Sequence, residues 1–423
     1  MMMRRKKLLF VVLPIFLILS IVSVTMLLQS SQTVKAENLL DDIKPKPIYA
    51  GLLSEEYIGA VSDFSIELFK KSIKDGKNSL VSPLSVYFAL GMTANGADGE
   101  TLAEFKRLLG KDRLSMEELN KNNYSLMKSL TDNKTNRLTI ANSIWYRENQ
   151  GLTVSKEFLQ TDGDYYKADA YMADFNDKRT VKDINNWVKK NTGGQIDSIV
   201  DGIDTNTMLY LFNTLYFEAE WETKYYKEAV RENKFHCSDG EDIETKFMYG
   251  SEYSYLSSDN CQGFVKNYAG DKFGFAALLP NQNISMDDFI ESLTGEAFQA
   301  LFKNASNETV QTAIPKFTTE YDCSLNNSLS SIGLTEAFDE DNANFTSMSN
   351  KDLYIADVRH KTFICVNEKG TKAGAVTKME MIAKSAMIKP PKEVILDRPF
   401  VYAIIDNQTS LPVFIGVMEN PKA

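Results

Sequence analysis

The sequence predicts an α+β fold built as one large domain. Helical hydrophobic periodicity dominates the first third of the 423 residues, whereas strand patterns dominate the remainder. No linker rich in proline, glycine or serine interrupts residues 57–420, and no internal repeat is present. Length alone would favour two or three domains at roughly 150 residues each. The absence of linkers favours a single domain instead.

Two helices are predicted near the start of this domain. Apolar side chains at mixed spacings of three and four predict a helix over residues 57–69. After a turn at Asp75 and Gly76, Ser82 is expected to cap a second helix that has Pro83 at its first position. Because this second helix is apolar on most faces, we expect it to be buried in the middle of the fold.

Strands are predicted along most of the later chain. Residues 208–217 are apolar at both odd and even positions, which is typical of a strand covered on both faces. Residues 352–366 alternate and are rich in β-branched and aromatic side chains. The other predicted elements are a helix over 180–190 and strands over 137–146, 273–279, 313–317, 401–405 and 413–418.

The composition argues against several classes of protein. Charged residues make up 25% and hydrophobic residues 43%, so the chain is neither disordered nor a collagen nor a coiled coil. A net charge of −10 argues against a nucleic-acid partner. The only histidines are His236 and His360, and none of the four cysteines has CxxC spacing. We therefore expect no metal site and no cofactor.

The N-terminus carries the pattern of an export signal. Four positive charges lie within the first seven residues, and residues 8–28 contain no charge. Val34-Lys35-Ala36 then offers a small-x-small cleavage site. An uncleaved membrane anchor is the alternative, since this apolar run could span a bilayer, and both place the globular part outside the cell. We expect residues 1–36 to be a signal peptide, 37–54 a spacer and 55–423 the domain.

Residues 368–391 fit neither a core strand nor an ordinary connection, which usually takes about four to six residues. The odd-numbered positions, which would share one face of a strand, begin with small, uncharged residues: Thr371, Ala373, Ala375 and Thr377. The even-numbered positions, on the opposite face, carry the charges: Lys372, Lys378 and Glu380. This is a strand pattern with one face for burial and one for solvent. The segment is either a plain edge strand or loop, or an exposed loop that can enter a sheet as a new strand.

Six motifs, in one order and at compatible spacing, resemble the serpin family over roughly residues 55–421. Each motif alone is weak, whereas the set is specific for the family and says nothing of the target. The motifs are residues 78–85 (NSLVSPLS), 211–217 with Trp221 (LFNTLYF and W), 314–317 (IPKF), 368–375 (EKGTKAGA), 397–400 (DRPF) and 414–421 (FIGVMENP).

The resemblance implies three β-sheets, eight or nine helices and a mobile reactive-centre loop from Lys369 to about Lys389. Inhibitory serpins offer this loop to a serine protease, which forms a covalent acyl-enzyme and is trapped when the loop inserts into the main sheet. It therefore implies a secreted protease inhibitor rather than an enzyme, and we expect a monomer. Basic and acidic residues are mixed over residues 101–130, so a heparin-type cofactor site is not expected.

The same resemblance assigns roles to individual residues. The hinge at the start of the loop comprises Glu368, Lys369, Gly370, Thr371, Ala373, Gly374 and Ala375. Ser82, Ser85, Asn213 and His360 match the shutter, where the strands of the main sheet part, and Trp221 matches the breach, where the loop first enters. The inward parity of the hinge lacks proline and charge, which favours an inhibitory member over a non-inhibitory binding or chaperone-like serpin.

The scissile bond is predicted by counting along the loop. The seventeenth residue from the hinge glutamate is Lys384, followed by Ser385, which suits a trypsin-like pocket. The loop is a few residues longer than the common pattern, so bonds after Ile382, Ala383, Ala386 or Met387 stay open and would suit elastase-like or chymotrypsin-like proteases. A hydrolase is disfavoured because the chain has no G-x-S-x-G, H-E-x-x-H or P-loop motif.

Overall fold

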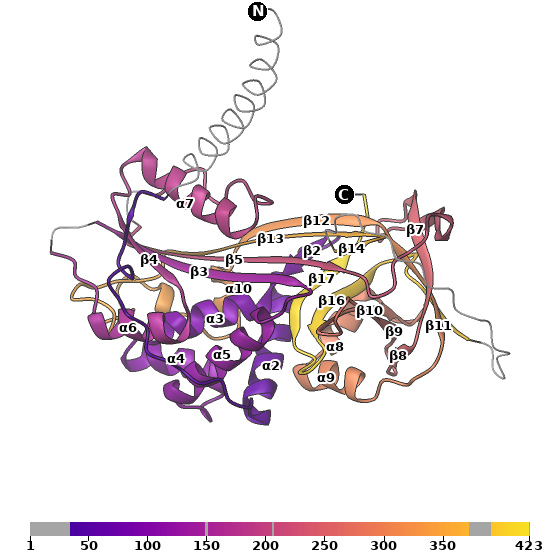
Figure 1. Cartoon of the computed structure of the whole chain (residues 1–423), viewed down its shortest axis with the longest axis horizontal. Helices are drawn as coiled ribbons and strands as arrows, with labels where there is room; N and C mark the ends of the chain where they lie inside the picture. The colour runs from indigo at the N-terminus through magenta and orange to yellow at the C-terminus, as the bar shows by residue number, and fades with distance from the viewer. Residues whose placement is uncertain (1–33, 149–150, 205–206, 372–390, 423) are drawn as a thin grey trace, which may run out of the picture.

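A seven-stranded sheet runs along the molecule, with most helices gathered beneath one half and two smaller sheets at the other end (Figure 1). The computed structural model describes residues 34–148, 151–204, 207–371 and 391–422. Across the sheet, the strands are β1 (Glu37–Asn38), β4 (Asp169–Ala173), β3 (Arg137–Arg147), β5 (Leu209–Glu220), β14 (Gly370–Thr371), β13 (Asp357–Asn367) and β12 (Phe317–Ser324).

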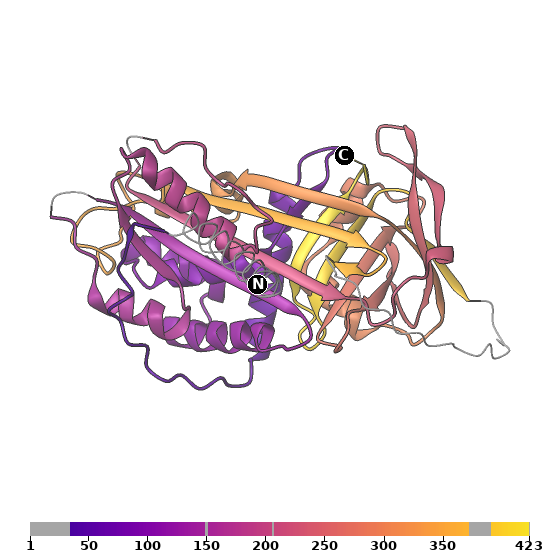
Figure 2. The same ribbon diagram turned by 45° about the horizontal axis from the view of Figure 1, so that its top comes forward.

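The two central long strands follow their sequence patterns. β5 is buried along nearly its whole length because α7 (Lys178–Asn191) lies over one face of the sheet and α3 (Pro83–Ala94) lies under the other (Figures 1 and 2). β13 alternates strictly between buried and half-buried residues, as its alternating sequence predicts. β5, which is buried on both faces, and β13, which is buried on one face, therefore lie side by side as parallel neighbours.

The two smaller sheets complete the β-structure. The second sheet has six strands in the order β2 (Ser79–Val81), β17 (Pro412–Met418), β16 (Phe400–Asp406), β10 (Phe273–Pro280), β9 (Cys261–Asn267) and β8 (Ser254–Ser257). The third has four strands in the order β15 (Lys392–Ile395), β11 (Val310–Pro315), β7 (Asp242–Glu252) and β6 (Val230–His236). The predicted α+β domain with three sheets is thus confirmed.

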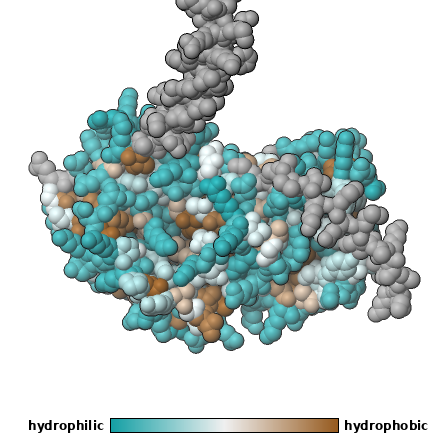
Figure 3. All heavy atoms as spheres, viewed as in Figure 1, coloured by the Kyte–Doolittle hydropathy of each residue, from teal (hydrophilic) through white to brown (hydrophobic). Residues whose placement is uncertain are grey.

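The described ranges contain nine α-helices, within the eight or nine expected. Besides α3 and α7 they are α2 (Glu55–Ser72), α4 (Gly99–Gly110), α5 (Met116–Thr131), α6 (Lys156–Tyr165), α8 (Met286–Ser292), α9 (Gly295–Lys303) and α10 (Asn326–Ser331). Every residue of α3 is buried, as predicted. On the face shown in Figure 3, hydrophilic residues dominate and hydrophobic ones form scattered areas.

Ser82 departs from its predicted role as a helix cap. It occupies the N-cap position of α3, with Pro83 first in the helix, but its side chain makes no capping hydrogen bond. The hydroxyl instead donates to the carbonyl of Val413 in β17, at 2.8 Å. Because Ser82 lies between the main sheet and the second sheet, tertiary partners displace the local cap.

The segment expected to be a spacer lies along the body of the domain. β1 pairs with β4, and the backbone N–H of Leu39 donates to the carbonyl of Ala170 at 2.7 Å. The backbone N–H of Lys46 donates to the carboxylate of Asp164 at 2.6 Å. Leu39, Leu40 and Ile43 are partly buried against the main core. The sequence pattern missed this docking because only a few apolar residues, without periodicity, carry it.

Several predictions fall on residues 1–33 and 372–390, outside the described residues. They concern most of the export signal, the candidate scissile bonds and the hinge beyond Thr371. In the part of the chain that the structure describes, no helix is both long and apolar enough to cross a bilayer, and no group of acidic, cysteine and histidine side chains could hold a metal ion. All four cysteines are free thiols.

Candidate functional site

The seam between β5 and β13 is closed at one end and open at the other. At the closed end, Tyr210–Thr214 of β5 pair directly with Asp357–Lys361 of β13. At the open end, the two residues of β14 lie between the strands, with Thr371 opposite both Ala219 and Val366. Within the described ranges, no strand fills the stretch between these two pairings. The main sheet therefore has room for a further strand that would continue from Thr371.

The hinge is held at the open end by the chain that follows β5. The indole N–H of Trp221 donates to the carbonyl of Asn367 at 2.8 Å, and its backbone N–H donates to that of Lys369 at 2.9 Å. The backbone N–H of Tyr225 donates to the carbonyl of Glu368 at 3.0 Å. Trp221 and Tyr225 thus fix three successive carbonyls, from Asn367 to Lys369, at the start of the hinge.

The first inward residue of the hinge is already inside the sheet. Thr371 is 2% exposed, and its hydroxyl lies 2.6 Å from the hydroxyl of Tyr268. Tyr268 in turn stacks on Trp221, with ring centroids 4.5 Å apart, and its burial raises the pKa of its phenol. The neighbouring Gly370 has a φ of +150°, and a Cβ there would lie 2.1 Å from the carbonyl oxygen of Ala219. Only glycine fits at this position between two strands.

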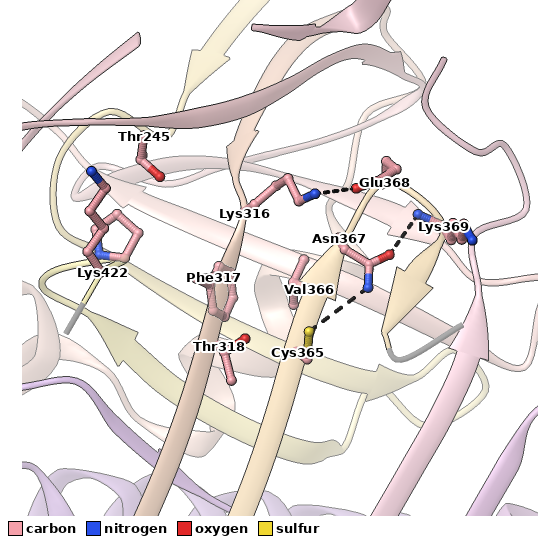
Figure 4. Close-up of a pocket in the computed structure, with 11 residues that line it drawn as sticks. Thr245, Lys316, Phe317, Thr318, Cys365, Val366, Asn367, Glu368, Lys369 and Lys422 are labelled. Atoms are coloured by element: carbon pink, nitrogen blue, oxygen red, sulfur yellow. Dashed lines mark hydrogen bonds and ion pairs between the residues drawn. The ribbon is translucent and has the colours of Figure 1, made fainter. Parts of the chain in front are cut away.

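A groove of about 700 Å³ borders the outer side of the hinge (Figure 4). Across it, the ammonium of Lys316 lies 2.6 Å from the carboxylate of Glu368, and this hydrogen bond lowers the pKa of Glu368. The Asn367 side chain accepts a hydrogen bond from the backbone N–H of Lys369 at 2.9 Å. These contacts fix the tight turn between β13 and β14.

The four shutter residues meet beneath the closed end of the seam. The amide oxygen of Asn213 lies 2.6 Å from the hydroxyl of Ser85 and 3.1 Å from Nδ1 of His360. The amide nitrogen of Asn213 donates to the carbonyl of Ser85 at 2.8 Å. All four residues, including Ser82, are fully buried. The structure therefore brings together residues from β2–α3, β5 and β13 that are far apart in sequence.

His360 is a neutral member of this network. The backbone N–H of Ser82 donates to Nε2 of His360 at 3.0 Å, so Nε2 accepts and the ring proton resides on Nδ1, which donates to Asn213. Burial lowers the pKa of His360 to about 3, because the charged imidazolium would lose its hydration. The shutter is thus held by hydrogen bonds without a net charge.

The motif comparison missed two residues of the site. Asn142 of β3 accepts a hydrogen bond from the amide nitrogen of Asn213 at 2.6 Å, and Tyr268 contacts Thr371 as described above. Asn142 could have been suspected as an amide inside an otherwise apolar strand pattern. Tyr268 lies just beyond β9 and carries no comparable local signal, because only the tertiary fold brings it to the hinge.

The remaining predicted site residues lie outside the described residues. These are the later hinge residues Ala373, Gly374 and Ala375, the favoured bond at Lys384 and Ser385, and the alternatives Ile382, Ala383, Ala386 and Met387.

Comparisons with known proteins point to one family. The model of the family described as Serpin (serine protease inhibitor) matches residues 59–421. A leukocyte elastase inhibitor A of Rattus norvegicus is 30% identical over 385 residues, covering 87% of this chain and all of the relative. The neuroserpin of Homo sapiens is 29% identical over 383 residues, covering 86% of this chain and 91% of the relative.

Solved structures agree with this match. The crystal structure of the thermophilic serpin tengpin in its native state is 48% identical, with a TM-score of 0.87, and covers 92% of this chain and all of tengpin's. The latent state of tengpin, at the same identity, gives a TM-score of 0.78 and covers 88% of this chain. The fold described above is therefore more similar to the native than to the latent form.

Proposed function

The chain belongs to the serpin family, whose members are generally protease inhibitors, and from this premise we propose that it is an irreversible inhibitor of serine proteases. The protease serine would attack the carbonyl carbon of the residue before the scissile bond, the peptide bond would break, and an acyl-enzyme would remain. The freed segment upstream of the bond would then insert between β5 and β13, carrying the bound protease with it.

One observation carries this proposal: Gly370–Thr371 already lies between β5 and β13, and no strand of the described residues fills the seam beyond it. An inserted strand would gain ladder hydrogen bonds on both sides and bury one side-chain face. A segment of about 14 residues spans roughly 46 Å, at ~3.3 Å per residue. That length would carry the protease to the far end of the sheet. Because the inserted form would be the more stable one, the native state would be a kinetic trap.

The parity of the hinge supports insertion rather than passive binding. Thr371 faces inward and is buried, so Ala373, Ala375 and Thr377 would follow on the same face. Each of these is small and uncharged, and the charges of Lys372 and Lys378 would face solvent. We therefore rank the inhibitor above a non-inhibitory binding or chaperone-like serpin.

For the target we propose a trypsin-like protease that cuts between Lys384 and Ser385. A lysine side chain would pair with the buried carboxylate of such a pocket. The relative named leukocyte elastase inhibitor A favours the alternative that a bond after Ile382, Ala383, Ala386 or Met387 is cut by an elastase-like or chymotrypsin-like protease.

We further propose that residues 1–36 direct export and that the exported protein is a monomer of residues 37–423. The charge pattern of the N-terminus supports export, with an uncleaved anchor on the outer face as the alternative. N-terminal sequencing of the exported protein and sedimentation of the 37–423 form would test both points.

The test of the proposed function is a panel of trypsin, elastase and chymotrypsin incubated with the protein. An SDS-stable complex and the mass of the released C-terminal fragment together identify the reaction and the bond. Lys384→Ala should abolish inhibition of trypsin and spare that of elastase. If the loop is cut by every protease and no covalent complex forms, the chain is a non-inhibitory serpin.

A further inference from the structure

A charged pair is buried directly beneath the residues that hold the hinge. Lys266 lies in β9, and its side chain is 4% exposed. Its ammonium lies 2.7 Å from the carboxylate of Glu252, at the end of β7. A lysine is almost never this deeply buried unless it is paired. The pair joins the second and third sheets at the open end of the main sheet.

The ammonium of Lys266 also faces the two aromatic residues that hold the hinge. It lies 4.6 Å from the ring centroid of Tyr225 and 5.5 Å from that of Trp221. These distances suit cation–π attraction, which is stronger where water is excluded. Through the backbone N–H groups and the indole N–H of these two residues, the charge is connected to the carbonyls of Asn367, Glu368 and Lys369.

Net stability does not explain this pair. Burial raises the pKa of Glu252, and the ammonium of Lys266 only partly opposes this effect, while Glu222 adds to it. Buried ion pairs of this kind are often no more stabilising than apolar residues of similar size. What a fixed cation does provide is a single geometry, because both rings are drawn toward one point.

We propose that Lys266, paired with Glu252, is a positioning residue for loop insertion: it holds Trp221 and Tyr225 in place, so that the hinge points into the seam. This inference rests on the proposed function. An incoming strand must enter directly after Thr371, so the orientation of the preceding turn sets how readily insertion begins. Without the cation, the rings of Trp221 and Tyr225 are no longer held and insertion slows. A larger share of the acyl-enzyme is then hydrolysed before insertion can trap the protease.

Hydrogen exchange tests the geometry without any protease. In Lys266→Met, the amides of Trp221 and Tyr225, which donate to the hinge, should exchange at least about tenfold faster than in the parent, as should those of Gly370 and Thr371. Glu252→Gln should give the same change, and Lys266→Arg, which keeps the cation, should restore the parent rate. Unchanged exchange at these amides in Lys266→Met would overturn the inference.

The matched control is Lys70→Met in α2. The Lys70 side chain is 10% exposed and interacts with Glu67 and with backbone carbonyls near α8, away from the hinge. A general loss of stability would lower the unfolding temperature in both variants. Faster exchange at the hinge should occur only in the Lys266 variant, and equal acceleration in both would leave Lys266 a merely structural residue.

Inhibition kinetics supply the functional measurement. Lys266→Met should raise the number of inhibitor molecules consumed per protease by at least about twofold, while loop cleavage proceeds at the parent rate. A parent protein that forms no covalent complex would refute the proposed function, while the exchange experiment would still decide the role of Lys266. Parent-like consumption in Lys266→Met, together with faster hinge exchange, would refute the link from geometry to insertion.

Discussion

The two ends of the β5–β13 seam are held by different kinds of interaction. At the closed end, Asn213 and His360 belong to a fully buried network of neutral hydrogen bonds. At the open end, aromatic stacking on Trp221, the buried Lys266–Glu252 pair and the half-exposed Lys316–Glu368 pair hold the hinge.

This difference shows how a sheet can be stable and still accept a strand. The neutral network joins directional groups that lose much when one partner is removed. It therefore holds β5 and β13 together in the native state, and an inserting strand that reaches the far end of the sheet must part them there. The open end holds the hinge by its backbone carbonyls and by one small side chain, Thr371, so the side chains that would follow remain free to enter the seam. Four changes would break or sharpen this comparison.

The largest effect is expected for Thr371→Arg at the open end. Thr371 already lies between the strands, so keeping an arginine there would bury an unpaired charge at a cost of several kcal/mol. The hinge should therefore leave the sheet, insertion should not begin, and the protein should become a substrate. Ala375→Arg should act in the same way. Gel analysis after protease treatment should show cleaved protein and no covalent complex. The control is Lys372→Glu, on the outward parity, which should inhibit normally; equal inhibition by all three variants would argue against strand insertion.

Asn213→Leu should produce the next largest effect, at the closed end. It would leave the ring N–H of His360 and the amide oxygen of Asn142 without their partner, at about 1–3 kcal/mol for each group that stays unsatisfied. The Ser85 hydroxyl would keep the carbonyl of Ser82 as its acceptor. The unfolding temperature should fall clearly. Asn327→Leu, at an exposed position of α10, is a suitable control, and a parent-like unfolding temperature for Asn213→Leu would contradict the role of the network.

The pH dependence of stability should reveal the neutral histidine. His360 has a pKa of about 3 when folded and about 6.5 when unfolded, so the unfolded chain binds the extra proton first. Its contribution is fully present above pH 6.5 and is lost as pH falls from 6.5 toward 3, at about 1.4 kcal/mol per pH unit. Urea unfolding midpoints should therefore fall more steeply with acid in the parent than in His360→Gln. Parallel curves would mean that His360 does not titrate in this way.

The smallest effect is expected for Lys316→Ala. The Lys316 and Glu368 side chains are 32% and 36% exposed, so water screens their attraction, and the loss should be at most about 1 kcal/mol. The unfolding temperature should barely change. Because the pair borders the hinge turn, hydrogen exchange at the amide of Gly370 is the sensitive measurement. A large fall in the unfolding temperature would show that the open end depends more on charge than we infer.

Much of the fold was predictable because its signals are local. The two-sided burial of β5 follows from its continuous apolar run, and the alternation of β13 follows from its own pattern. The complete burial of α3 follows from its apolar faces. The docking of residues 37–54 was not predictable, since a few partly buried apolar side chains and hydrogen bonds of the backbone carry it.

The candidate site divides in the same way. The motifs locate Asn213, His360 and Trp221, but they do not reveal that the Ser82 hydroxyl bonds to Val413 rather than capping its helix. Nor do they reveal Asn142, Tyr268 or the Lys266–Glu252 pair. In each case the partner lies on another element, and the choice of partner depends on how the elements pack.

The α+β class, the family and the main buried helix and strands could be recognised in the sequence alone, because each depends on residue types at short, regular spacings. The tertiary structure alone decided that Thr371 already lies between β5 and β13, that His360 is neutral, and that a buried cation supports the residues that hold the hinge. These features depend on burial and on the meeting of distant strands, which set the energy of a charge or a hydrogen bond and which no local pattern records.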